Sequence, residues 1–446
     1  MKLISNAPGV NNESAPDGAY AGDRPPKLLI VSVALVPLDA LGVDVAGQQI
    51  RLYMLFAAAG IFLHWMKIFR GGRSNVSRQP VIWLGLLTIM SLASAGWSEA
   101  RDVTLVVAFG QIFLFVWMLV TISCFADLKR ARLPYLALLT GLQISVSISC
   151  MQVLLSLGGY DFGVWRNVGI PWARPTGLTA EPVWAALNAS ILFLMMSFSS
   201  QHLRRRRVWV LLSLFVLVMT FSRAAIVATL VAYFAAMLFS FFTSKNEEQF
   251  RRNIARLLLA TVTLFSAIVV AYPFVPESIK SRFALILQLS NPSSLADGGS
   301  YASRNGIQRY VFDNWSDSAW VGHGVGSLEP VSQDPSVRQL YAGGGELNSG
   351  AGSTNFFFTH LYDLGLIGLA FSILFALSLF VAAVALRGAG TVPFAITMSL
   401  VVQFSASNGF RLGVAWIAVA VAFNLARHDY AAGPDSPNVL TKHSVR

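Results

Sequence analysis

Apolar runs long enough to cross a membrane recur along almost the whole chain, with short polar breaks between them. A run of roughly 20 apolar residues matches the ~30 Å hydrocarbon core of a bilayer. Continuous apolar length therefore predicts an all-α polytopic membrane protein with about twelve transmembrane helices, of which the seventh and eighth are the least clearly separated. They are expected at residues 28–45, 50–68, 80–96, 103–125, 133–157, 183–200, 207–221, 224–243, 257–275, 356–386, 391–406 and 411–426.

The segments between these runs divide the chain unequally. Residues 1–27 are polar and predict a disordered tail, residues 28–275 carry helices one to nine, residues 356–426 carry the last three, and residues 427–446 form a second tail. The exception is the loop at 276–355, which is 80 residues long, far beyond the usual limit of about 15. Within it Ile307, Tyr310, Val311 and Trp315 recur at helical spacing. This spacing predicts a short amphipathic helix that lies on the membrane surface or caps a cavity.

Composition supports a membrane protein and excludes other classes. Apolar residues make up 55% of the chain and charged residues only 12%, about half the share of a soluble domain. A soluble enzyme, a nucleic-acid binder and a disulfide-built secreted domain are therefore excluded. The two cysteines, Cys124 and Cys150, both fall in apolar runs, so we expect neither a disulfide framework nor a thiolate metal site.

The net charge of +11 is mostly a matter of topology. A cytoplasmic N-terminus places 22 of the 33 basic residues, but only 8 of the 22 acidic ones, on the cytoplasmic side. This distribution obeys the positive-inside rule, and the even number of spans returns the C-terminus to the cytoplasm. We interpret the four consecutive arginines at 204–207 as a topology anchor, and we expect the bilayer, not a nucleic acid, as the partner. The long segments 158–182 and 276–355 then lie on the outer side.

Arginines on the outer side are informative because topology does not explain them. Arg223 stands between two apolar runs, at a depth where an arginine costs several kcal/mol unless it is paired or faces a polar cavity. The alternative to a functional role for Arg223 is a structural one, an ion pair with an acid of a neighbouring span. One guanidinium group can bind two oxygens of a phosphate at once. Several arginines close together would therefore suit a lipid-linked diphosphate. The other candidates, of which Arg309 could instead face solvent, are Arg166, Arg174, Arg304, Arg309 and Arg411.

Acidic and glycine-rich positions complete the candidate chemistry. Glu181 immediately precedes the sixth predicted helix, where the helix dipole stabilises a carboxylate. It could serve only that structural purpose, or it could orient an acceptor hydroxyl. The sequence shows no D-x-D pair and no His/Asp/Glu cluster with metal spacing, so we expect no metal and no cofactor. The GHGVGS stretch at 322–327 lacks the lysine of a P-loop and predicts a tight turn.

Four pieces occur in an order that is similar to a known family. They are GLTAEP at 177–182, SRAA at 222–225, Arg304 followed by W-x4-W-x-G-x-G-x-G-S at 315–327, and STNFFFTHLYDLGLIGL at 353–369. Their order and their shared outer position resemble the O-antigen ligase/polymerase superfamily of bacterial envelope enzymes. The resemblance covers about residues 160–370.

This resemblance implies an integral-membrane glycosyltransferase of the C-type, all-helical architecture in the bacterial inner membrane. Such an enzyme transfers a glycan from undecaprenyl diphosphate to a sugar hydroxyl at the periplasmic face, with inversion and without a metal. The implied partners are the lipid-linked donor, a glycan or lipid-linked acceptor, and a chain-length regulator. Glu181, Arg223 and Arg304 become the candidate catalytic residues. Candidates for substrate binding are Arg166, Arg174, Arg309, Thr354, Asn355 and Arg411.

One departure from the family pattern bears on the reaction. Ligases of this family typically have His-Asn where this chain has Thr354 and Asn355. A threonine cannot act as a base near neutral pH, and His360 lies more than one helical turn further on. We therefore favour a polymerase of O-antigen or exopolysaccharide repeats over a ligase that joins the glycan to the lipid A core. A transporter or flippase is the alternative of another class, disfavoured because the unexpected charges gather at one face and no repeat is visible.

Overall fold

The computed structural model describes residues 26–45, 48–66, 78–126, 128–165, 173–199, 203, 205–243, 255, 300–342, 355–407 and 412–431. Helices account for most of them, and two short antiparallel β pairs complete the fold. The strands are β1 (Gly42–Val45) with β2 (Gln48–Arg51), and β3 (Val164–Trp165) with β4 (Arg174–Pro175). The helices are α1 (Lys27–Leu35), α2 (Leu52–His64), α4 (Arg78–Ala93), η1 (Ser94–Gly96), α5 (Arg101–Cys124), α6 (Leu128–Leu157), α7 (Pro182–Phe198), α8 (Arg206–Met219), α9 (Arg223–Thr243), α12 (Ser300–Asn314), η4 (Trp315–Ser318), α13 (Leu328–Gln333), α14 (Pro335–Ala342), α15 (Phe356–Ala385), η6 (Arg387–Gly390), α16 (Thr391–Phe404) and α17 (Gly413–Ala431).

Eleven of the twelve predicted spans contain a helix, and the ninth, at 257–275, lies outside the described residues. Among the described residues five helical segments are long and apolar enough to cross a membrane, and α2 and α7 are apolar but shorter. The five are Arg78–Gly96, Arg101–Cys124, Arg130–Leu157, Arg223–Thr243 and Phe356–Ala385. The chain is therefore a helical, multi-pass membrane protein, while the count of twelve crossings stays a prediction.

The first predicted span is wrong in its second half. Helix α1 ends at Leu35, and the chain then turns into the β1–β2 hairpin. Pro37 lacks the N–H that would continue the helix. By contrast, the boundary expected near Ser222 is confirmed, since α8 ends at Met219 and α9 begins at Arg223.

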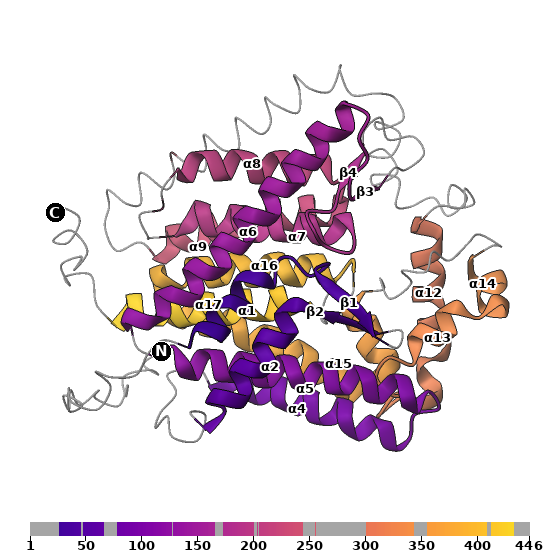
Figure 1. Cartoon of the computed structure of the whole chain (residues 1–446). Helices are drawn as coiled ribbons and strands as arrows, with labels where there is room; N and C mark the ends of the chain where they lie inside the picture. The colour runs from indigo at the N-terminus through magenta and orange to yellow at the C-terminus, as the bar shows by residue number, and fades with distance from the viewer. Residues whose placement is uncertain are drawn as a thin grey trace, which may run out of the picture.

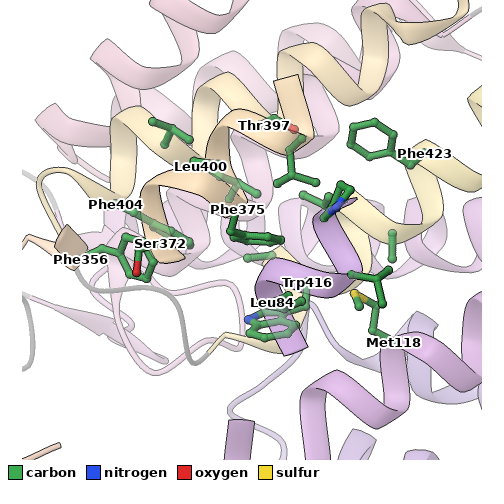
Figure 2. A pocket seen from close by; sticks show the side chains of 18 of the residues that line it. Leu84, Met118, Phe356, Ser372, Phe375, Thr397, Leu400, Phe404, Trp416 and Phe423 are labelled. Carbon is green, nitrogen blue, oxygen red and sulfur yellow. The ribbon is translucent and has the colours of Figure 1, made fainter. Parts of the chain in front are cut away.

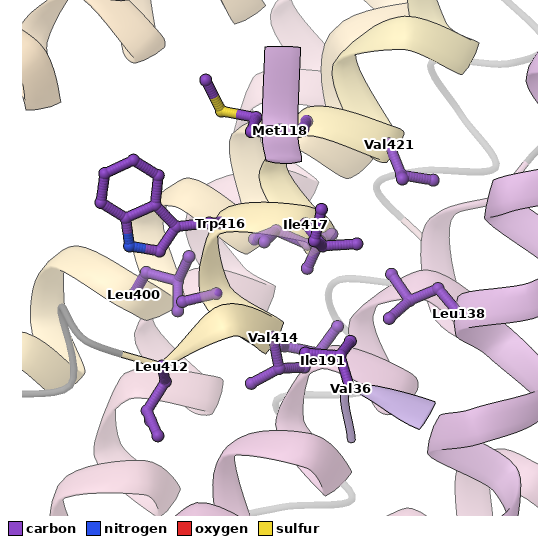
Figure 3. Packing of buried hydrophobic residues seen from close by; sticks show 14 of the residues in the cluster. Val36, Met118, Leu138, Ile191, Leu400, Leu412, Val414, Trp416, Ile417 and Val421 are labelled. Atoms are coloured by element: carbon purple, nitrogen blue, oxygen red, sulfur yellow. The ribbon is translucent and has the colours of Figure 1, made fainter. Parts of the chain in front are cut away.

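The core lies where α6, α7, α16 and α17 meet. Figure 3 shows Val414, Ile417 and Val421 of α17 packed among apolar side chains that include Ile191 of α7 and Leu138 of α6. Most residues of α7 are buried, as expected for a helix that is apolar on every face. These helices form the interior around which the more exposed helices pack.

A chain of hydroxyl groups fixes three helices to one another. Ser190 Oγ of α7 lies 2.9 Å from Ser399 Oγ of α16 and 2.7 Å from Thr229 Oγ1 of α9. Small polar residues let helices approach closely and exchange hydrogen bonds inside a membrane. The start of α9, which carries Arg223, therefore belongs to a helix that is fixed to the centre of the bundle.

Both β pairs and helices α12 to α14 lie at one end of the helical bundle, at the right in Figure 1. Helix α12 contains Ile307, Tyr310 and Val311 of the predicted amphipathic helix, whereas Trp315 begins η4. Ile307 and Val311 are buried against Leu328 and Tyr362. The apolar face of α12 thus packs on α13 and α15. We call this end of the molecule, where both β pairs and α12 to α14 lie, the loop end.

Candidate functional site

The GLTAEP loop is held tightly on α6. Gln152 Oε1 accepts hydrogen bonds from the amides of Thr176 (3.0 Å) and Gly177 (2.9 Å), and Ser145 Oγ donates to the carbonyl of Gly177 (3.0 Å). Gly177 has φ +60°, and a Cβ there would lie 2.3 Å from Ser149 Oγ. Only glycine fits such a close, left-handed position. The motif is therefore a rigid support for the residue that follows it, Glu181.

Glu181 lies at the end of this loop, where α7 begins. It takes the N-cap position of α7 with an extended backbone (φ −142°, ψ 152°), and Pro182 follows as the first residue of the helix. The Thr179 hydroxyl lies 2.8 Å from the carbonyl of Glu181, which fixes the turn. The side chain of Glu181 is partly exposed. Its position suits both the expected interaction with the helix dipole and a role toward a ligand outside the loop.

A buried ion pair lies directly beneath the loop. Arg51 Nη1 of β2 is 3.5 Å from Asp39 Oδ2, and Asp39 is only 6% exposed. The amide of Ala40 donates to the carbonyl of Leu178 (2.9 Å), which joins this turn to the GLTAEP loop. Burial raises the pKa of the Asp39 carboxyl, and Arg51 offsets this only in part. The neighbouring charge of Glu181 also raises that pKa, so the two carboxyl groups belong to one electrostatic cluster.

The sequence reasoning did not include this pair among the candidate residues. Its signal was present nonetheless, because Asp39 lies within an apolar run and Arg51 is a basic residue on the expected outer side. Ionisable groups in such positions are paired or functional by default. The pair was missed because neither residue belongs to one of the four motifs.

Arg174 links the GLTAEP loop to the SRAA turn. Its Nε donates a 2.6 Å hydrogen bond to the carbonyl of Thr220, in the turn between α8 and α9. Phe221 in that turn has φ +53°, and Arg223 follows as the exposed first residue of α9. The residues just before these two motifs, which are far apart in the sequence, are thus hydrogen-bonded to each other at the loop end. Glu181 lies seven residues after Arg174, and Arg223 lies three residues after Thr220.

The GHGVGS stretch is a turn, as expected, and its amide groups are already occupied. Asp363 of α15 is 1% exposed, and its carboxylate accepts hydrogen bonds from the amides of Gly326 (2.7 Å) and Leu328 (3.2 Å). The hydroxyl of Ser327 lies 3.3 Å from the same carboxylate. Backbone amides arranged in this way form a concavity that suits an anion. Here a side chain of the protein itself fills it.

Helix α15 folds back on itself at Gly365. This residue has φ +65° and ψ −163°, so residues 356–364 and 366–385 form two helical segments. His360 Nδ1 lies 2.5 Å from Ser372 Oγ, across the fold, whereas twelve residues of straight helix would separate them by roughly 18 Å. His360 is 2% exposed and packs against the ring of Phe356 (centroids 4.2 Å apart). It is a buried structural residue, in agreement with the expectation that it is a poor substitute for a catalytic base.

The close approach of the loop to α15 depends on two glycines. A Cβ at Gly365 would lie 2.4 Å from the carbonyl carbon of Trp320, and one at Gly322 would lie 2.4 Å from that of Asp363. Trp97 Nε1, from the α4–α5 connection, donates to the carbonyl of Gly322 (3.0 Å). The turn is therefore clamped between α15 and the end of α4.

The structure describes only some of the remaining candidate residues. Arg309 is exposed on α12, in keeping with the solvent alternative, and Arg304 belongs to the same helix although its side chain lies outside the described residues. Asn355 caps α15, since its Oδ1 accepts from the amide of Phe357 (2.8 Å). Arg166, Thr354 and Arg411 lie outside the described residues. Within the part of the chain that the structure describes, no three His, Cys, Asp or Glu residues are grouped to hold a metal ion.

Comparison with known proteins agrees with these motifs. The fold and the apolar helices define a multi-pass membrane protein with a polar cluster at its loop end. Residues 208–373 match the family model described as O-Antigen ligase, and this match supports the resemblance to the O-antigen ligase/polymerase superfamily. The matched segment contains Arg223, Arg304 and Asp363. A search of the curated proteins finds no match to the chain.

Proposed function

We propose that the protein is an inverting, metal-independent glycosyltransferase that polymerises O-antigen or exopolysaccharide repeat units from an undecaprenyl-diphosphate-linked donor. The observation that carries this proposal is the hydrogen bond from Arg174 to Thr220. It joins the loop that bears Glu181 to the turn that bears Arg223. In the site that we propose, two cationic groups and one carboxylate face one end of a membrane helix bundle, which is the arrangement that a lipid-linked diphosphate and a hydroxyl acceptor require.

The reaction needs little covalent chemistry from the protein. The acceptor hydroxyl forms a bond to the anomeric carbon on the face opposite the diphosphate, and the bond from that carbon to the diphosphate oxygen breaks. The leaving diphosphate keeps the electron pair, and the guanidinium groups of Arg223, Arg304 and Arg174 stabilise its charge. The proton of the hydroxyl passes to a base, for which Glu181 is our candidate. The remaining predicted contacts, from Arg166, Arg309, Thr354, Asn355 and Arg411, would hold the two glycans.

The polymerase is preferred to the ligase because of Thr354. The ligase pattern has a histidine there, and the nearest alternative, His360, is buried and bonded to Ser372. A ligase that joins the glycan to the lipid A core is the second candidate. A transporter or flippase is the third, and the location of Arg174, Glu181 and Arg223 at one end of the bundle speaks against a binding site at the membrane midplane.

Topology completes the proposal. We place the loop end at the periplasmic face of the bacterial inner membrane and both termini in the cytoplasm, following the distribution of basic residues. Residues 1–27 and 427–446 are then cytoplasmic tails, and residues 276–355 form one large periplasmic loop between the first nine helices and the last three. The acceptor is a second lipid-linked glycan, and a chain-length regulator is the partner expected for such a polymerase.

A glycan profile of a strain that lacks the gene tests the proposal. A polymerase predicts that single repeat units remain attached to the final acceptor. Absence of any capped acceptor, with polymer accumulating on the lipid carrier, would assign the ligase instead. Repeat units retained on the cytoplasmic side of the membrane would support the flippase, and an unchanged profile would reject all three readings.

A further inference from the structure

An apolar cavity lies between α4, α5, α15, α16 and α17, and the reaction proposed above does not use it. The empty space in and around it, which includes the open region at its entrance, is about 1070 Å³. Figure 2 shows that its walls are formed by large apolar side chains, among them Leu84, Met118, Phe375, Leu400 and Trp416. Water gains few hydrogen bonds in such a space, whereas a hydrocarbon chain fits it well.

The length of the cavity suits one lipid chain. Along α17 its lining extends from Ala415 to Arg427, which is roughly 18 Å at 1.5 Å per residue. Half of a ~30 Å hydrocarbon core, the depth of one leaflet, is about 15 Å. The cavity therefore matches a single acyl chain of one leaflet. A chain of many isoprene units would extend well beyond it.

One end of the cavity is cationic. Among the described residues that line it, Arg427 is the one charged residue, and it stands near the end of α17. Its Nη1 atom is buried and has no hydrogen-bond partner among the described residues. A buried donor without an acceptor costs free energy, and a phosphate oxygen would satisfy both its hydrogen bond and its charge.

This cationic end is remote from the candidate active site. A Cβ added to Gly413, the first residue of α17, would lie 3.1 Å from the hydroxyl oxygen of Tyr53, which is two residues from Arg51 at the loop end. Arg427 lies fourteen residues further along the same helix, roughly 21 Å away. A lipid whose phosphate meets Arg427 therefore has its head at the opposite end of the bundle from Arg174, Glu181 and Arg223.

We propose that this cavity is a structural lipid site that takes one acyl chain of an anionic glycerophospholipid, with the lipid phosphate against Arg427. The apolar walls favour a hydrocarbon chain, and the length of the cavity favours an acyl chain of one leaflet. Arg427 favours an anionic head group. The site does not depend on the proposed transfer reaction.

Native mass spectrometry of the purified full-length protein tests the site. The probes are phosphatidylglycerol, phosphatidylcholine with the same acyl chains, and undecaprenyl phosphate, each added at the same concentration in detergent. We expect the protein to retain one phosphatidylglycerol in preference to the other two. Arg427→Gln should weaken that retention roughly tenfold, the scale of one charge-assisted hydrogen bond. Arg387→Gln is the matched control, because Arg387 is exposed on η6, which packs against α17, and does not line the cavity.

A cavity-filling variant and a label separate this site from general lipid adhesion. Ala420→Phe should reduce retention of phosphatidylglycerol and phosphatidylcholine alike, because it occupies the space of the chain. A phosphatidylglycerol with a photoreactive acyl chain should label the wild-type cavity wall near Phe423, which does not depend on the folding of any variant. Equal retention of both glycerophospholipids, no effect of Arg427→Gln, or labelling elsewhere would overturn the proposal. Preferred retention of undecaprenyl phosphate, lost in Arg427→Gln, would overturn the acyl-chain assignment in favour of an isoprenoid.

Discussion

The backbone amide of Gly326 donates a 2.7 Å hydrogen bond to Oδ2 of Asp363, so that a carboxylate within a membrane helix anchors the turn that follows α12. The same carboxylate accepts from Leu328, the first residue of α13. One buried anion thus fixes the position of α12 and α13 relative to α15. Because α12 carries Arg304, the placement of a candidate catalytic residue depends on a side chain from a different helix.

Replacement of Asp363 tests this anchor. In Asp363→Asn one of the two carboxylate oxygens becomes an NH₂ group that cannot accept from an amide. We expect a loss of about 1–3 kcal/mol, the cost of a buried donor left unpaired. Thermal unfolding of the detergent-solubilised protein measures it. Asp317→Asn, at an exposed position of η4, is the control, and equal stability of the two variants would contradict the anchor.

Gly365→Ala should be more damaging. The new methyl group would lie 2.4 Å from the carbonyl carbon of Trp320, at a backbone conformation of φ +65° and ψ −163° that is essentially restricted to glycine. We expect little folded protein in size-exclusion profiles. Gly110→Ala, where nothing lies within 4 Å of the added atom, should instead be neutral or stabilising by up to about 1 kcal/mol. A well-folded Gly365→Ala protein would show that the fold in α15 does not need glycine.

Arg223→Ala and Arg304→Ala should each abolish long-chain polymer while protein levels stay normal. Loss of one group that stabilises developing charge typically costs about 10²- to 10³-fold in rate. Gel profiles of the glycan from complemented deletion strains measure the polymer. The matched control is Arg101→Ala, because Arg101 is also an exposed first residue of a helix, α5. Normal long-chain polymer from either variant would reject the proposal that these arginines bind the diphosphate.

Glu181→Gln should slow transfer by about 10²- to 10⁴-fold if the carboxylate takes the proton of the acceptor. The pH dependence of the reaction separates this role from a structural one. The wild-type rate should rise with pH as the carboxyl ionises, and the variant should lose that rise. Glu99→Gln removes an exposed carboxylate from the α4–α5 connection and should leave the profile unchanged. A variant with the wild-type pH profile would mean that Glu181 is not the base.

Arg51→Ala should destabilise the protein by about 3 kcal/mol near pH 7.5, because it leaves the buried carboxylate of Asp39 without its cation. The pKa of Asp39 is already raised in the folded protein, so its contribution to stability falls as pH rises from the unfolded value of about 3.9 through the raised one. Without Arg51 that pKa rises further. The cost of the substitution should therefore be smaller at pH 5 than at pH 7.5, because a larger share of Asp39 is protonated at the lower pH and a protonated carboxyl needs no partner.

Unfolding temperatures at both pH values, with Arg101→Ala as control, measure this effect. The double variant Asp39→Asn with Arg51→Ala should recover most of the lost stability and lose the pH dependence. If Arg51→Ala costs the same at pH 5 and pH 7.5, then the charge of Asp39 is not the cause of its effect.

The sequence predicted those features that depend on local pattern. The spacing of Ile307 and Val311 located α12 and its buried face, and the break at Ser222 located the start of α9. The two motifs with Glu181 and Arg223 were expected on one side of the membrane, and the structure joins the residues just before them through the hydrogen bond from Arg174 to Thr220. Each of these predictions needed only periodicity, apolar length or charge.

The features that escaped prediction depend on contacts between distant segments. The apolar run from 356 to 386 fits one continuous helix, and only the contact with the 322–327 turn reveals why Gly365 breaks it. Asp39 was counted within the first span because apolar length outweighed the two acids in it, Asp39 and Asp44. The ion pair with Arg51 arises from the hairpin register, with Gly42 opposite Arg51, which hydrophobic patterning does not encode.

The break at Gly365 divides one apolar stretch into two helical segments with different roles. The second segment, 366–385, has twenty residues, roughly 30 Å of helix, which already equals the thickness of the hydrocarbon layer. The preceding nine residues, 356–364, are therefore not needed to cross the membrane, and their sequence can serve another contact. A hydropathy profile predicts one unusually long span here. The structure instead has a short helix at 356–364, whose end contacts the 322–327 turn, followed by the longer helix at 366–385. Insertions or deletions in 356–364 should consequently alter the fit of that turn without changing the number of times the chain crosses the membrane.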